Sequence, residues 1–262
     1  MILSAGAIGC TPPEIPILLC HNGNCAEGSP PSADDTIAAL RASLALRTAD
    51  GRSPIDGLEL DSVWDRARGG CTYGHTPDAG NPDFADAVNE ITSYLSRAPA
   101  GTAAHSGDAF FLKIELKVDV GGGAHHTADE VAAHAACVTA AENAAIAAGR
   151  ATGNPVTPIF DSDEPTLLAA IETPAFRDGA DRDGIDYKFE TEWGSALPAG
   201  FLPQIFTVGW FDLPSSLVWV DHGLLIWARD PSLADLSQML NHAPMYLNVN
   251  NVLDARGFLD AQ

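Results

Sequence analysis

Three acidic residues and two histidines in the first half of the chain have the types and spacing that a metal-dependent site requires: His21, Glu59, Asp61, His75 and Glu115. Glu59 and Asp61 are separated by one residue of an apolar run, so in a strand both carboxylates face the same side. Glu115 and Lys117 have the same relation in a second apolar run. We therefore expect the three carboxylates to converge, with the Lys117 ammonium beside them.

Three converging carboxylates need a positive partner, because like charges raise one another's pKa and taking each ion out of water costs several kcal/mol. Oxygen ligands with room for water suit Mg²⁺, or Ca²⁺ in a looser cage, better than zinc, which prefers nitrogen and sulfur. We expect Mg²⁺ as the cofactor, held by Glu59, Asp61 and Glu115, with Ca²⁺ as the alternative. Taken singly, these motifs also fit a solvated strand end and ordinary loop histidines.

Short apolar runs alternate with helix-like segments along the chain, which is typical of βα units and a parallel sheet. The strands are expected at Ile15–Cys20, Gly57–Asp61, Ala109–Val118, Pro155–Phe160, Gly184–Phe189, Gln204–Val208, Leu224–Ala228 and Met245–Val249. The helices are expected at Asp34–Leu46, Asp83–Leu95, Asp129–Ala148, Glu164–Glu172, Leu213–Val220 and Leu233–Asn241. Eight strands predict a closed (β/α)8 TIM barrel rather than a doubly wound open sheet. Since no long linker divides the chain, residues 1–262 are expected to form a single domain.

The barrel also explains why the candidate residues would meet. Reactive side chains in this fold come from the carboxyl ends of the strands and from the loops that follow them. His21 directly follows the first predicted strand, and His75 lies in the loop after the second. Leu58 and Leu60 should face the helices, because they alternate with the acidic residues.

The charge and hydropathy of the chain exclude some partners. With 14 Lys+Arg against 35 Asp+Glu, the formal charge is −21, which repels nucleic-acid phosphates, so no nucleic-acid partner is expected. No apolar run approaches the roughly 18 residues of a membrane span. Met1–Cys10 lacks the features of a signal peptide. We expect a soluble chain without a transmembrane segment; its location stays open, with secretion favoured if a leader was removed.

The five cysteines do not have the paired spacing of a structural zinc site. Cys20 ends an apolar run and Cys137 lies in a helical pattern, so both are interpreted as small buried apolar residues. Cys25 and Cys71 lie in polar loops that a barrel would place on the same face. A disulfide between Cys25 and Cys71 is the resulting hypothesis.

Six short motifs, taken in order, resemble the glycerophosphodiester phosphodiesterase superfamily. They are CHNG (Cys20–Gly23), SADDTIAAL (Ser32–Leu40), DGLELD (Asp56–Asp61), YGH (Tyr73–His75), IELK (Ile114–Lys117) and LLIWARD (Leu224–Asp230). The resemblance implies that the three carboxylates bind Mg²⁺, and that His21 and His75 act as base or nucleophile and as general acid. It also implies that Trp227 flanks the substrate, although ordinary barrel packing is an equal interpretation. The substrate would be a phospholipid or a glycerophosphodiester.

Two departures bear on the branch of the superfamily. Glycerophosphodiesterases usually carry arginine after the first histidine, where this chain has Asn22. The loop GGCTYGHTPDAG (Gly69–Gly80) is more similar to the sphingomyelinase D-type phospholipase D branch, whereas Glu115 is the acid typical of the glycerophosphodiesterases. We therefore expect a phospholipase D-like activity, in which an internal hydroxyl could attack to leave a cyclic phosphate.

Several alternatives remain open from the sequence. The chain could be a glycerophosphodiester phosphodiesterase acting on a deacylated head-group diester, or a barrel that uses the same site for binding or for non-hydrolytic chemistry. An enolase-type lyase fits the early histidines poorly. Lys188 is a candidate phosphate ligand or a partner of Glu190 or Glu192. The sequence does not predict the oligomeric state.

Overall fold

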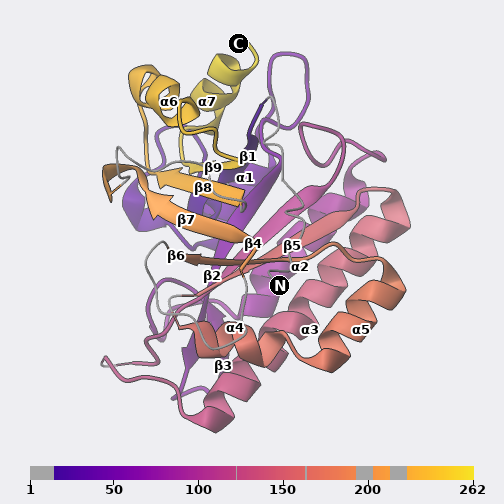
Figure 1. The fold of residues 1–262 in the computed structure, drawn as a ribbon, viewed down its shortest axis with the longest axis vertical. Helices are drawn as coiled ribbons and strands as arrows, with labels where there is room; N and C mark the ends of the chain where they lie inside the picture. The colour runs from indigo at the N-terminus through magenta and orange to yellow at the C-terminus, as the bar shows by residue number, and fades with distance from the viewer. Residues whose placement is uncertain (1–14, 122, 163, 193–202, 213–222) are drawn as a thin grey trace, which may run out of the picture.

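The computed structural model describes residues 15–121, 123–162, 164–192, 203–212 and 223–262. Within these ranges, eight parallel strands form a closed barrel with helices around it (Figure 1). The strands are β1 (Ile17–Cys20), β2 (Gly57–Asp65), β4 (Phe110–Leu116), β5 (Val156–Asp161), β6 (Lys188–Glu192), β7 (Ile205–Gly209), β8 (Gly223–Ala228) and β9 (Tyr246–Val249). Each strand pairs with the next barrel strand along the chain, and β1 pairs with both β2 and β9. The predicted (β/α)8 barrel is confirmed.

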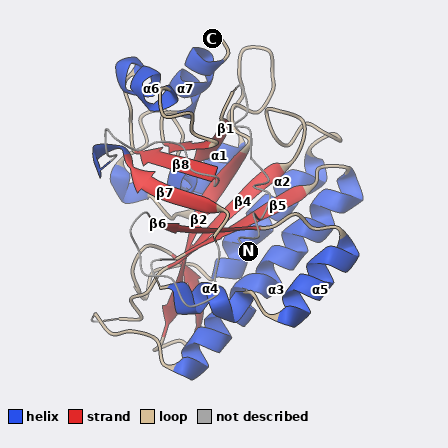
Figure 2. Ribbon diagram, viewed as in Figure 1, coloured by secondary structure: helices blue, strands red, loops and turns tan. Residues whose placement is uncertain are grey.

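The helices flank the strands on the outside of the barrel (Figure 2). They are α1 (Ile37–Leu44), α2 (Phe84–Arg97), α3 (Ala128–Thr152), α4 (Pro165–Ile171), α5 (Pro174–Asp183), α6 (Leu233–Leu240) and α7 (Val252–Leu259), with short 3-10 turns η1 (His21–Gly23), η2 (Pro31–Ala33) and η3 (Trp210–Asp212). Local sequence sets several of their ends. A capping box of Thr127 and Glu130 begins α3, and Gly153 ends it in the left-handed conformation that glycine adopts without strain.

Most predicted elements overlap the observed ones, and one strand is displaced. β6 begins at Lys188, whereas the strand was predicted from Gly184. The physical reason is that Gly184 caps α5 with a φ of 63°. The helix α5, the helix α7 and the strand β3 (Gly70–Tyr73) were not predicted. The predicted helix Leu213–Val220 lies outside the described residues.

A hairpin extends the second barrel strand. β3 pairs antiparallel with the outer half of β2, with Ser62 opposite Tyr73 and Asp65 opposite Gly70. The hairpin returns the chain to the mouth of the barrel, where the Gly74 N–H donates to the Asp61 carbonyl at 3.2 Å. The residue after Gly74 is His75, so the hairpin brings this histidine back to the end of β2.

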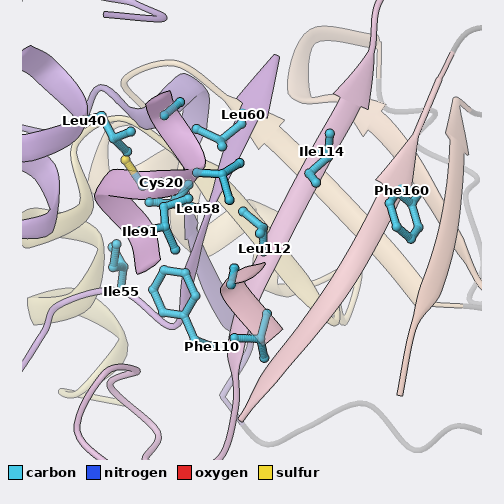
Figure 3. Packing of buried hydrophobic residues seen from close by; sticks show 14 of the residues in the cluster. Cys20, Leu40, Ile55, Leu58, Leu60, Ile91, Phe110, Leu112, Ile114 and Phe160 are labelled. Atoms are coloured by element: carbon cyan, nitrogen blue, oxygen red, sulfur yellow. The ribbon is translucent and has the colours of Figure 1, made fainter. Parts of the chain in front are cut away.

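The apolar core has two parts that follow from strand alternation. Between the barrel and the helices, Leu58 and Leu60 of β2 pack with helix side chains such as Leu40 and Ile91, as predicted (Figure 3). A smaller cluster fills the amino-terminal half of the barrel interior: Leu19, Ile159, Ile205, Leu225 and Tyr246. Above this apolar floor, the inward-facing positions of β2, β4 and β5 are charged. The polar site thus rests on a filled core.

Two disulfides connect the four cysteines of the described ranges, and neither is the pairing that was predicted. Cys20 is bonded to Cys25, and Cys71 is bonded to Cys137. The prediction of a Cys25–Cys71 bridge, with Cys20 and Cys137 unpaired, was wrong. η1 turns the chain after β1 so that Cys25 returns to Cys20. The β2–β3 hairpin presents Cys71 to α3, where Cys137 lies.

The two disulfides should differ in their contribution to stability. In the chain-entropy model, a bond that closes 66 residues contributes about 4 kcal/mol and one that closes 5 residues about 2 kcal/mol. We expect the double variant Cys71→Ala/Cys137→Ala to lose more unfolding free energy than Cys20→Ala/Cys25→Ala, by about 2 kcal/mol. Urea denaturation of both variants measures this difference. An equal or reversed order would contradict the expectation.

The helix α3 is long and apolar enough to cross a membrane by length and composition alone. It instead packs along α2 and α4 as an outer helix of the barrel. Its buried face carries Glu142, which is 1% exposed, and whose Oε2 has no hydrogen-bond partner among the described residues. Burial raises the pKa of Glu142 to about 8.

This buried acid makes stability depend on pH. The folded chain keeps the Glu142 proton at pH values where the unfolded chain releases it, so the unfolding free energy falls as the pH rises towards about 8. We expect Glu142→Gln to remove this dependence, so that the stability of the variant relative to the wild type grows by ~1.4 kcal/mol per pH unit between about pH 5 and about pH 8 and then levels off. Urea denaturation at several pH values measures it. A difference that does not change with pH would show that Glu142 is not protonated in the fold.

Candidate active site

The carboxyl end of the barrel opens into a cavity of about 1050 Å³. Six of the eight residues that the sequence singled out line it: His21, Glu59, His75, Glu115, Lys117 and Trp227. Asp61 lies directly beneath, with 0% of its surface exposed. The structure therefore brings together seven of the eight predicted site residues.

The three carboxylates converge as strand alternation predicted. Asp61 of β2 lies opposite Glu115 of β4 in the parallel register, and Glu59 is one inward position below Asp61. One oxygen of each carboxylate lies within 4.8 Å of an oxygen of each of the other two. The Oδ1 atom of Asp61 is buried without a hydrogen-bond partner among the described residues. Oxygen ligands at this spacing fit a hard divalent cation such as Mg²⁺.

The carboxylates differ in their electrostatic surroundings. Burial opposes the ionisation of Glu59, but the charges of Lys113 and His21 outweigh it and hold the pKa of Glu59 well below its usual value. Burial raises the pKa of Glu115 to about 8, and the neighbouring Asp61 contributes in the same direction. The protein alone thus leaves Glu115 short of positive charge, which a bound cation would supply.

Lys117 bridges two of these carboxylates. Its Nζ bonds to Glu115 and lies 3.3 Å from Oδ2 of Asp61. Burial lowers the pKa of Lys117, but Asp61 and Glu115 outweigh burial, so that its pKa lies above the usual value. Lys117 therefore remains a cation at the cavity wall.

His21 is oriented by residues of β8 and of the chain just after β9, the strand that pairs with β1. Its Nδ1 donates to Oδ1 of Asn250 at 3.1 Å, and its Nε2 lies 3.7 Å from Oε2 of Glu59. With Nδ1 carrying the proton, Nε2 is the nitrogen that can accept another. The Trp227 ring stacks on the imidazole at 5.7 Å between centroids and 4° between planes. Trp227 is 37% exposed, so it both fixes His21 and presents a face to the cavity.

His75 is oriented in the same manner by a carboxylate. Its Nδ1 donates to Oδ2 of Asp61 at 2.8 Å, which leaves Nε2 for proton transfer. Unlike His21, the imidazole of His75 is largely exposed. Two histidines, each held through Nδ1, therefore stand at the rim of one carboxylate cluster.

Beneath the three carboxylates lies a second group of charged side chains, which was not predicted from the sequence. The Nζ atom of Lys113 lies 2.5 Å from Glu59, 2.9 Å from Asp161 and 3.3 Å from Glu190, and all four side chains are buried. Burial opposes the charge of Lys113, but its three acidic partners raise its pKa well above the usual value. The sequence did contain a signal for Lys113, because it precedes Glu115 by two residues in β4 and so faces the same barrel interior.

Two asparagines complete the support for the site. Asn248 of β9 donates to Oε2 of Glu59 at 2.8 Å, and Asn250 holds His21 and donates to the Asn24 carbonyl. Asn248 faces the barrel interior from β9, and Asn250 has the same parity just beyond the end of that strand. Alternation along β9 could therefore have identified both. Asn22, which follows His21, has a φ of 50°, and its N–H donates to Glu59 at 3.3 Å. Asparagine tolerates this left-handed conformation better than most residues.

Lys188 does not belong to the site. It begins β6 rather than ending a strand, and its Nζ bonds to Asp186 at 2.6 Å. It therefore lies at the amino end of β6, away from the residues that line the cavity, so the structure does not bring it to the predicted phosphate site, and it pairs with Asp186 rather than with Glu190. The side chain of Glu192, the other predicted partner, lies outside the described residues. The cavity instead contains Arg229, which pairs with both oxygens of Asp34 at 2.8 and 3.0 Å.

Comparison with known proteins bears on the fold. The chain matches no model of a protein family, and it matches no curated protein in sequence. Among solved structures it is similar to a glycerophosphodiester phosphodiesterase from Parabacteroides distasonis ATCC 8503, with a TM-score of 0.60 and 13% identity over 94% of this chain and 97% of that one. It is also similar to a glycerophosphodiester phosphodiesterase from Agrobacterium tumefaciens str. C58, with a TM-score of 0.53 and 12% identity over 93% and 100% of the two chains. At these identities the likeness is one of fold.

Proposed function

We propose that this chain is a metal-dependent phosphodiesterase that cleaves a phosphodiester of a phospholipid or lysophospholipid. The observation that carries the proposal is the cluster of Glu59, Asp61 and Glu115 with two histidines at its rim, each held through Nδ1. The similar solved structures, named as glycerophosphodiester phosphodiesterases, support the choice of a phosphodiester as the reacting bond.

The side chains divide the work of an in-line displacement at phosphorus. A bound Mg²⁺ would neutralise charge on the phosphodiester and on the pentacovalent transition state. Lys117 adds a fixed positive charge at the same wall. His21 accepts the proton of the attacking hydroxyl, or attacks phosphorus itself, through Nε2. His75 donates a proton to the leaving oxygen through its own Nε2.

The branch of the reaction depends on the attacking group. A hydroxyl of the substrate next to the phosphate gives a cyclic product, and water gives a linear one. The phospholipase D-like interpretation is favoured by the Gly69–Gly80 segment, whose cysteine is bonded to α3. The alternative is a glycerophosphodiester phosphodiesterase acting on a deacylated diester.

The two disulfides are typical of proteins from oxidising compartments, which supports secretion.

A substrate panel tests the proposal. Glycerophosphodiesters, lysophospholipids and sphingomyelin are incubated with the chain and Mg²⁺, and the products are identified by phosphorus NMR. We expect turnover of a lysophospholipid or of sphingomyelin, with the cyclic or linear product revealing the attacking group. Turnover of deacylated diesters alone would select the alternative. No turnover of any member, alongside tight Mg²⁺ binding, would contradict the enzyme and favour a binding role.

A further inference from the structure

Asp35 is a buried carboxylate in the site that the proposed reaction does not use. It lies in the loop between η2 and α1 and lines the same cavity as the catalytic candidates. The residue is 8% exposed, and its Oδ1 has no hydrogen-bond partner within the described ranges. An unpaired buried carboxylate oxygen is costly unless a ligand satisfies it.

The orientation of Asp35 relates it to Asp61 rather than to the rest of the cluster. Ligand atoms of Asp35, Asp61 and His75 lie within 4.8 Å of one another, and Asp61 is the residue that this group shares with the cluster of Glu59, Asp61 and Glu115. Oδ2 of Asp61 is occupied by His75 and Lys117, whereas Oδ1 has no partner in the described part of the chain. Two unsatisfied acidic oxygens therefore lie on neighbouring side chains of one cavity.

The charge of the cavity supports a second cation. When ionised, Asp35, Glu59, Asp61 and Glu115 carry four negative charges, of which Lys117 offsets one. Lys113 also contacts Glu59, but it is shared with the buried Asp161 and Glu190, whose two negative charges exceed its one positive charge. One divalent cation leaves the group negative by one charge, and an entering phosphodiester makes it negative by two. A second divalent cation makes the substrate-bound site neutral.

We propose a second divalent-cation site at Asp35 and Asp61, so that Asp61 is shared by two cations. Mg²⁺ commonly binds through one or two carboxylates and completes its shell with water and a substrate phosphate oxygen, which matches two protein ligands at an open cavity. His75 keeps its hydrogen bond to Asp61 and remains available as the acid. The relevance to catalysis depends on the proposed function, but the cation site itself does not.

The number of bound ions tests this proposal without any substrate. The full chain is stripped of metal, titrated with Mn²⁺ alone, and studied by native mass spectrometry and electron paramagnetic resonance. We expect two ions per chain, with magnetic coupling between them, because cations sharing one carboxylate lie about 4 Å apart. Asp35→Asn should bind one ion and lose the coupling. Asp78→Asn, which alters another aspartate lining the cavity, should still bind two coupled ions.

Other outcomes would overturn the second site. A wild-type chain that binds one ion or none at saturation would do so, even if the Asp35→Asn variant did not fold. Two uncoupled ions would mean that the second ion binds elsewhere on this acidic surface. Two coupled ions in Asp35→Asn would show that Asp35 is not a ligand. Two coupled ions in the wild type and one in Asp35→Asn, with no turnover of any phosphodiester, would support the second cation site and contradict only the proposed function.

Discussion

The His21→Ala and His75→Ala variants are each expected to cleave a phosphodiester ~10²- to 10⁴-fold more slowly than the wild type, the usual effect of removing a proton-transfer group. Each imidazole is held through Nδ1, His21 by Asn250 and His75 by Asp61, which leaves Nε2 for the reaction. The pairing of His21 with Glu59 and of His75 with Asp61 also places them next to the proposed metal ligands. Initial rates under saturating Mg²⁺ measure the effect.

The control must separate catalysis from folding and metal binding. His125→Ala changes an exposed histidine in the loop before α3, and it should retain the wild-type rate. Both site variants should melt cooperatively and still bind Mn²⁺. Wild-type rates in His21→Ala and His75→Ala would contradict their roles. A slow variant that had lost its metal would not support proton transfer.

Lys113→Met is expected to lower the unfolding free energy by about 3 to 5 kcal/mol, because it leaves buried acids without their counter-charge. The Lys113 ammonium contacts Glu59, Asp161 and Glu190 in the centre of the barrel. Urea denaturation at neutral pH measures the loss. The effect should be smaller at low pH, where protonation of the carboxylates removes the need for the cation.

The matched control is Lys188→Met. Lys188 pairs with the exposed Asp186, and exposed ion pairs contribute little, so the change should stay within about 0.5 kcal/mol. Equal losses in the two variants would indicate a general effect of removing a lysine from this acidic chain. No loss in Lys113→Met would contradict the buried charge network.

The part of the site that could be predicted from the sequence is the set of side chains that strand alternation places. The period of two in β2 and β4 places Glu59, Asp61 and Glu115 on the barrel interior, and the structure brings their oxygens within 4.8 Å. The same rule applied to all positions would have added Lys113 and Asn248. Neither was predicted, because both lie inside a strand, Lys113 in β4 and Asn248 in β9, whereas most of the predicted residues lie at or just after a strand end.

Features set by loops and hairpins could not be predicted in this way. Asp35 reaches the site only through the path of the loop before α1, with a φ of 58° that sequence periodicity does not signal. The partner of Cys71 depends on which face of the β2–β3 hairpin meets α3. Lys188 was predicted to end a strand, because the apolar residues after Gly184 resembled the start of one. Gly184 instead ends α5, and β6 begins only at Lys188. The single-domain assignment and the roles of the site residues remain predictions.

We expect phosphodiester cleavage to require a divalent cation that the carboxylates of β2 and β4 hold. Phosphorus NMR of one turned-over substrate checks this requirement, with metal-stripped wild type and with Asp61→Asn, before and after Mg²⁺ is added. We expect no cleavage by stripped wild type, recovery on adding Mg²⁺, and no recovery in Asp61→Asn. Cleavage by the stripped wild type, or full Mg²⁺-dependent cleavage by folded Asp61→Asn, would contradict this requirement.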